Sequence, residues 1–101
     1  GYRLSVDGNI ICEELLVQLS GDWPDYVFAD GYQTPDLKAW AKHIKEKRHL
    51  PGIPSAAEVA ARGGIDVGET NRLLLEKVEQ LTLLLIDQQN QIDALKASLN
   101  K

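Results

Sequence analysis

A seven-residue repeat of apolar side chains runs through the last third of the chain and limits the folds that are open to it. Residues 66–101 contain no proline and a single glycine, Gly68, so they favour one continuous helix, roughly 50 Å long at about 1.5 Å per residue. Apolar residues recur in two sets, each spaced by seven and offset by four, as in the a and d positions of a coiled coil. The ten positions, eight of them aliphatic, are Val67, Asn71, Leu74, Val78, Leu81, Leu85, Gln88, Ile92, Leu95 and Leu99.

Such a helix needs a partner for its apolar face, because a chain of 101 residues has room for one small domain. A strict seven-residue repeat predicts a left-handed supercoil of several copies. Leucine at both a and d positions does not favour a dimer, and Gln88 at a d position fits the wider core of a trimer. Asn71 and Gln88 are polar core residues of the kind that set register and oligomeric state. The repeat predicts a parallel homotrimer, with a homodimer as the alternative.

The first 21 residues carry signals of β-structure. Leu4 and Val6 alternate with polar neighbours, and Asp7, Gly8 and Asn9 supply turn residues before a second apolar run. We expect a hairpin with short strands here. Because so short a β-segment cannot form its own core, it is predicted to be the end of a longer β-rich shaft. The chain starts with glycine and contains no methionine, which we interpret as a fragment of a longer protein.

Residues 22–65 predict a small helical domain with an aromatic core. Trp23, Tyr26 and Phe28 lie within six positions, and Pro24 blocks a regular helix at that point. Aromatic side chains bury large areas, so we expect a packed loop and a short strand. A carbohydrate-binding patch is the alternative interpretation, with possible ligand contacts at Trp23, Tyr26 and Tyr32.

Two helices are predicted inside this middle region. Thr34 and Pro35 have the residue types of an N-cap and a first helical position. Ser55 and Glu58 have the spacing of a capping box, which predicts a short helix that ends near Arg62. Glycines follow that position, as they often do at the end of a helix.

The long helix begins at a second pair of capping residues, Asp66 and Glu69. Its upper half has extra leucines outside the a and d positions, so we expect that half to pack on the small domain. Its lower half is polar outside those positions and is predicted to project as a bare coiled coil. The sequence predicts an α+β fold in three parts, a β-shaft end at 1–21, a helical domain at 22–65 and a coiled-coil helix at 66–101.

The motifs of common enzyme classes do not occur in the sequence. A net charge of -4 argues against nucleic acid or an anionic membrane as a partner. The chain has no phosphate-binding loop, dinucleotide fingerprint or nucleophile elbow. His43 and His49 are six residues apart, unlike a helical metal pair, and we interpret the basic cluster around them as a solvated helix face. We predict no enzymatic activity, no cofactor and no metal site.

Several runs of sequence resemble a domain found at the C-terminus of many bacterial surface and tail-fibre-like proteins. They are residues 23–28, 49–56 and 64–69, the last of which leads into the leucine-rich run 73–81. More distantly, the layout is similar to the endosialidase-type intramolecular chaperone of phage tail spikes. That family places a small helical domain and a long C-terminal helix after a trimeric β-fibre.

The resemblance implies an extracellular, cell-surface or phage-particle domain that promotes folding and trimeric assembly of the upstream fibre segment of its own chain. Many members of the chaperone family then cut themselves off with a Ser-Lys dyad in a Ser-Asp-x-Arg-x-Lys-like segment. The serines that lack this context here are Ser5, Ser20, Ser55 and Ser98. We therefore expect assembly without self-cleavage. A receptor- or glycan-binding tip of a fibre is the alternative function.

Overall fold

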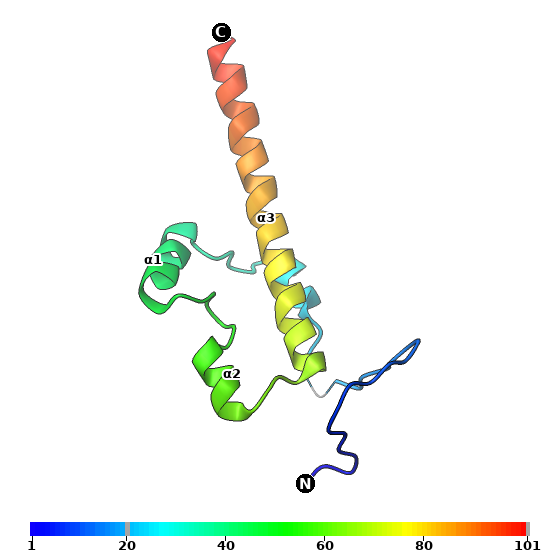
Figure 1. Cartoon of the computed structure of the whole chain (residues 1–101). Helices are drawn as coiled ribbons and strands as arrows, with labels where there is room; N and C mark the ends of the chain where they lie inside the picture. The colour runs from blue at the N-terminus through cyan, green and yellow to red at the C-terminus, as the bar shows by residue number, and fades with distance from the viewer. Residues whose placement is uncertain (20, 101) are drawn as a thin grey trace.

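A long helix forms the axis of the molecule, and shorter elements lie along its first half (Figure 1). The computed structural model describes residues 1–19 and 21–100. Ser20, in the predicted shaft segment, and Lys101, at the end of the predicted coiled coil, lie outside the described residues. The molecule measures 66 × 32 × 27 Å. Its elements are the 3₁₀-helix η1 (Pro24–Phe28) and the α-helices α1 (Leu37–Lys47), α2 (Ala56–Arg62) and α3 (Val67–Leu99).

The predicted α+β fold is wrong, because none of the described residues forms a β-strand. Before η1 the chain is an irregular arm that bulges away from the helices (Figure 1). In a strand, Leu4 and Val6 would lie on the same face and point toward a core. An isolated two-stranded hairpin, however, is marginal in water without a third strand or a helix to cover it. No such cover is provided within the described chain, and Leu4, Ile11 and Leu16 are 80%, 98% and 97% exposed.

The short strand predicted after the aromatic loop is also absent, because that segment forms the 3₁₀-helix η1. Pro24 occupies its first turn, where a missing N–H removes no hydrogen bond. Val27 is the buried hydrophobic side chain of the described residues, at 1% exposure, while the rings of Trp23 and Phe28 stay 50% and 53% exposed. The segment therefore docks through Pro24 and Val27 rather than through an aromatic core.

α1 starts two residues later than its sequence signal predicts. The N-cap is Asp36, whose side chain accepts a hydrogen bond from the Lys38 amide at 3.0 Å, so the predicted cap at Thr34 and Pro35 is wrong. A carboxylate is as good a cap as a hydroxyl, and its charge suits the helix N-terminus. The helix ends at Arg48, which adopts a left-handed conformation with φ 64°.

α2 is confirmed as predicted, with both hydrogen bonds of its capping box formed. The Ser55 hydroxyl accepts from the Glu58 amide at 3.1 Å, and the Glu58 carboxylate accepts from the Ser55 amide at 3.2 Å. The backbone hydrogen bond from Ser55 lowers the pKa of Glu58. Gly63 ends the helix with φ 84°, a left-handed conformation that glycine adopts without strain.

α3 is the single long helix that the sequence predicts, but its start differs in chemistry. Asp66 holds the N-cap position without a side-chain capping bond, because its carboxylate pairs with Arg62 at 2.8 Å. Glu69 pairs with Arg72 at 2.6 Å instead of reaching back to the cap. The predicted capping box at this point is therefore wrong, and two ion pairs take its place.

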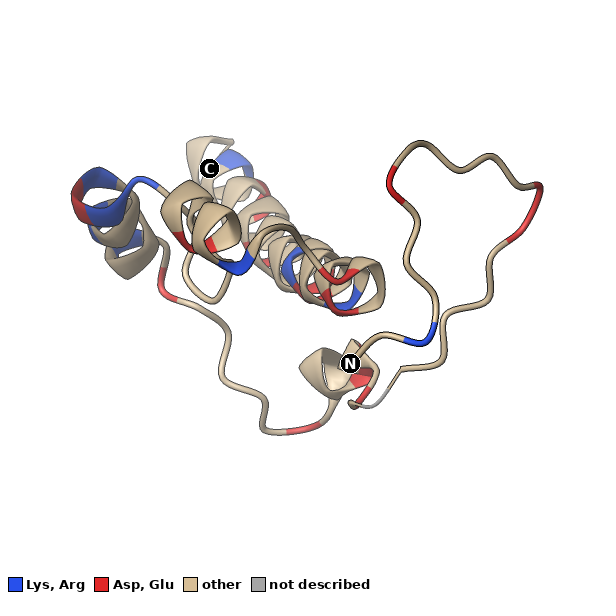
Figure 2. Cartoon of the chain, turned by 60° about the horizontal axis from the view of Figure 1, so that its bottom comes forward, with Lys and Arg blue, Asp and Glu red and all other residues tan. Residues whose placement is uncertain are grey.

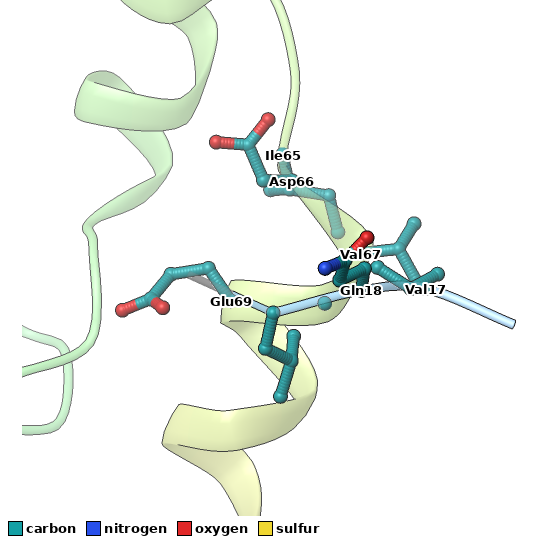
Figure 3. A pocket seen from close by; sticks show the side chains of 8 residues that line it. Val17, Gln18, Ile65, Asp66, Val67 and Glu69 are labelled. Atoms are coloured by element: carbon teal, nitrogen blue, oxygen red, sulfur yellow. The ribbon is translucent and has the colours of Figure 1, made fainter. Parts of the chain in front are cut away.

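The arm crosses α3 at its first turn, where Figure 3 shows Val17 and Gln18 beside Val67. Gly68 makes the crossing possible. A Cβ atom there would lie 2.6 Å from a methyl carbon of Leu19 and 2.7 Å from one of Val17. Glycine within a helix costs about 1 kcal/mol relative to alanine, and here it lets the arm lie directly on the backbone.

Candidate oligomerisation surface

The rest of the chain covers one side of α3 and leaves the opposite side open. With Asn71 as an a position and Val67 as a d position, the b, c, f and g positions of the upper half lie under η1, α1, α2 and their connectors. From Arg72 to Leu84 these covered positions are all buried or half-buried; they are Arg72, Leu73, Glu76, Lys77, Glu79, Gln80, Leu83 and Leu84. These segments form a layer over one side of α3, and this layer stops at the edges of the a and d stripe.

Hydrogen bonds hold this layer on the covered side of the helix. The Tyr26 hydroxyl of η1 donates to the Glu76 carboxylate, and that acceptor raises the pKa of Tyr26. Farther along, the Gln80 amide donates to the Tyr32 hydroxyl at 2.7 Å. Both contacts join residues about fifty positions apart in the chain, so they set where the middle region sits on α3.

Lys77 links the same cluster to α1. Its ammonium group donates to Gln80 at 3.2 Å and lies 5.3 Å from the centre of the Trp40 ring. It also pairs with Glu76 at 3.5 Å. Lys77 is 7% exposed and Gln80 is 6% exposed, so these polar groups are buried with partners rather than in water.

Glu79 is buried in the same layer without such partners. It is 8% exposed, and its Oε2 atom accepts no hydrogen bond within the described residues. Burial raises the pKa of Glu79 above its usual 4.5, and the nearby carboxylate of Asp25 raises it further. Because the folded protein disfavours the charged carboxylate, Glu79 stabilises the fold when it is protonated. This stabilisation is complete below pH 4.5 and is lost as the pH rises through the pKa that Glu79 has in the folded state.

We expect Glu79→Gln to raise the Tm at pH 7, because the variant removes a buried charge and keeps the shape of the side chain. The gain should shrink as the pH falls toward 4.5, where the wild-type carboxyl is protonated. Thermal denaturation followed by circular dichroism at pH 4 and pH 7 measures both effects. Glu46→Gln on the exposed side of α1 is the matched control and should leave the Tm unchanged. A lower Tm for Glu79→Gln at pH 7 would contradict the expected cost of the charge.

The ten heptad positions form one continuous exposed stripe along α3, which we call the seam. Every one of them is exposed in the single chain, from 45% at Ile92 to 83% at Leu99 among the aliphatic members. Mid-seam, Leu81 and Leu85 are 49% and 67% exposed. From Asp87 to Asn100 all residues are exposed, although residues 34–38 lie beside Asp87, Gln88 and Gln91. The fold brings the predicted oligomerisation residues onto one face, which stays exposed although the arm lies beside Val67 and residues 34–38 lie beside Gln88.

The possible ligand contacts are not gathered into one aromatic face. The hydroxyls of Tyr26 and Tyr32 are engaged by side chains of α3, and the two rings lie 6.2 Å apart at a tilt of 48°. Trp23, at 50% exposure, remains open to solvent. The sequence analysis did not identify the α3 partners of the two tyrosines. A helix face that mixes leucines with long polar side chains, as this side of α3 does, indicates a surface on which another segment packs.

The basic cluster lies on α1, where Lys and Arg residues gather (Figure 2). The rings of His43 and His49 pack edge to face with centroids 5.1 Å apart. Within the described parts of the chain, no three His, Cys, Asp or Glu residues are grouped as a metal site would require. No helix in residues 1–19 and 21–100 has the length and apolar character needed to cross a membrane.

Comparison with protein family models, with curated proteins and with solved structures finds no match to this chain. The resemblance to fibre domains therefore stays a prediction from the sequence, and the surfaces of the molecule carry the functional argument.

Proposed function

We propose that this chain is a homo-oligomerisation domain that associates through the seam of α3 as a parallel trimer. The observation that carries the proposal is the seam itself, an unbroken a and d stripe that the chain leaves exposed while it covers the other sides of the same helix. A monomeric helix turns its apolar stripe toward its own core. In this chain the a and d stripe of α3 faces away from the rest of the chain, as expected for a stripe that packs against another copy.

The exposed area supports association. The chain has 8864 Å² of accessible surface, whereas a compact monomer of 11.2 kDa exposes about 5,700 Å². Residues 1–18 of the arm and residues 87–100 of α3 are all exposed, and both contribute to the difference of about 3,000 Å². Obligate oligomers bury about 2,000 to 5,000 Å² in their interfaces, so association of copies accounts for an excess of this size.

Parallel packing uses the whole seam. When copies run in the same direction, Asn71 meets Asn71 and Gln88 meets Gln88, so each polar layer pairs with itself. An antiparallel arrangement that matched Asn71 with Gln88 would place Leu95 and Leu99 beside residues that precede α3. Those two leucines, 65% and 83% exposed in the single chain, would then stay in water.

Three strands fit the seam better than two. Leucine occupies a positions at Leu85 and Leu99 as well as d positions, and the Ile or Val at a with Leu at d that favours dimers is not maintained. The open arc also reaches the e positions Thr82 and Gln89, which are exposed. That arc is wider than the narrow a and d stripe of a two-stranded coil.

The resemblance to fibre domains supports an assembly role for this domain. A coiled coil has mainly local contacts, and such structures form quickly. Once the helices associate, the fibre segments joined to them meet at an effective concentration in the ~mM range. This role places the domain at a cell surface or on a phage-like particle, with copies of its own chain as partners.

We expect light scattering on a sizing column to give three times the 11.2 kDa mass of one chain at micromolar concentration. A single thiol at Asn100→Cys, in a Cys12→Ser background, reports direction, because parallel copies bring these ends together and oxidise to covalent dimers. A monomer mass would refute the proposal, a dimer mass would refute the strand number, and slow oxidation of an intact oligomer would refute parallel packing.

A further inference from the structure

An apolar hollow lies between α2 and the upper part of α3, directly beside the seam. Val59 and Ile65 line it from the α2 side, and Thr70 and Leu74 line it from α3. Its volume is about 80 Å³. Ile65 and Leu74 are 53% and 49% exposed, so the single chain leaves apolar surface of this hollow in contact with water. Leu74 belongs both to the hollow and to the seam, which makes the two surfaces continuous.

The heptad register determines which residue of a neighbouring copy meets this hollow. In a parallel coiled coil the g and e positions flank the core, and each g residue faces the e residue five positions farther along the next helix. Thr70, which lines the hollow, is a g position and therefore faces Leu75 of the neighbouring copy. Leu74, the adjacent d residue, packs against the same turn of the neighbour. The hollow thus opens toward one particular side chain.

The chemistry of the e positions agrees with this register. Leu75 is the aliphatic residue among the e positions of α3, which are Gly68, Leu75, Thr82, Gln89 and Lys96. Leu75 is half-buried within its own chain, and the part that stays open lies at the rim of the seam, where charged residues are usual in a coiled coil. Leu75 falls opposite an apolar wall that lies outside the heptad repeat, because α2 provides it. The aliphatic residue of these e positions therefore coincides with the apolar wall that α2 adds.

We infer that Leu75 of each copy inserts between α2 and α3 of the next copy, so that α2 recognises the neighbouring chain. The inference rests on the proposed parallel oligomer and adds a second contact outside the seam. Around a trimer each copy donates one Leu75 and receives one. The contact ties the register of α3 to the position of α2, so that a copy shifted by one heptad would place Thr82 at the hollow instead.

Disulfide trapping tests the contact. In a Cys12→Ser background, Val59→Cys with Leu75→Cys should give covalent trimers after oxidation, seen on a non-reducing gel and lost on reduction. The matched control pairs Val59→Cys with Thr82→Cys, one heptad or about 10 Å farther along the helix, and should give no cross-link. A contrary outcome is an oligomer that stays intact by light scattering while the thiols of Val59→Cys and Leu75→Cys remain unoxidised or form a disulfide within one chain. In that case the inference about Leu75 is wrong, whereas the proposed oligomer is not contradicted. A monomer in the Cys12→Ser parent would overturn both.

A second measurement avoids the introduced thiols. Val59→Phe fills the hollow from its own chain and should weaken association about tenfold. In that background Leu75→Ala should cost nothing further, because the place for the side chain is already taken. Independent, additive losses from the two substitutions, measured by sedimentation equilibrium, would contradict the inference.

Discussion

We expect Leu85→Asp to dissociate the proposed oligomer, whereas Ile86→Asp should leave it intact. The two residues are adjacent, aliphatic and similarly exposed in the single chain, at 67% and 53%, but Leu85 belongs to the seam and Ile86 lies outside it. Each buried leucine contributes about 2 kcal/mol, so the three copies of a trimer lose about 6 kcal/mol, or about 10⁴-fold in the association constant. Three carboxylates in one core layer add repulsion to that loss.

Light scattering at micromolar concentration measures the outcome, with circular dichroism to follow helix content. We expect a monomer mass for Leu85→Asp and the wild-type mass for Ile86→Asp. Dissociation by both variants would mean that added charge on α3 is enough to separate the copies, and dissociation by neither would exclude the seam as the interface.

We expect Gln88→Leu to raise the Tm of the proposed oligomer, by about 10 °C or more. The substitution replaces a polar layer with an aliphatic one, and burial of each leucine contributes about 2 kcal/mol per chain. The glutamine layer is expected to serve register rather than stability, so the variant should also form mixed registers. Asn90→Leu, on the exposed outer face of the same turn, is the matched control and should leave the Tm unchanged.

Thermal denaturation at several chain concentrations measures the change, because the Tm of an oligomer rises with concentration. A Tm below the wild-type value for Gln88→Leu would show that the glutamine layer stabilises the oligomer through its own hydrogen bonds. Equal gains from Gln88→Leu and Asn90→Leu would show that the effect comes from helix propensity rather than from the seam.

The long helix and its seam could be predicted from the sequence because both depend on local signals. The absence of proline from Val67 to Leu99 permits a single helix, and spacing alone identifies the a and d positions. The capping box of Ser55 and Glu58 was readable for the same reason, since both partners lie within one turn. Signals of this kind require no knowledge of what else the chain contacts.

The arm and the covered side of α3 could not be predicted, since they depend on partners distant in the chain. The alternation at Leu4 and Val6 predicts which face of a strand would be buried, but a strand also needs neighbouring strands to pair with. Lys77 and Gln80 look solvated on a hydropathy scale, although the Lys77 ammonium lies 5.3 Å from the centre of the Trp40 ring and the Gln80 amide donates to the Tyr32 hydroxyl. Long polar side chains can bury their carbon chains while their heads find specific acceptors.

In the proposed oligomer, the lower half of α3 gains its packing partners from the neighbouring copies. From Asp87 to Asn100 every residue is exposed, and only its first turn has residues 34–38 beside it; isolated helices shorter than about 12 to 15 residues are marginal in water. Without its neighbours this end would fray into coil, and each copy that binds would wind it up again. In the proposed oligomer, the helix content of the C-terminal turns is therefore expected to rise with the concentration of the chain.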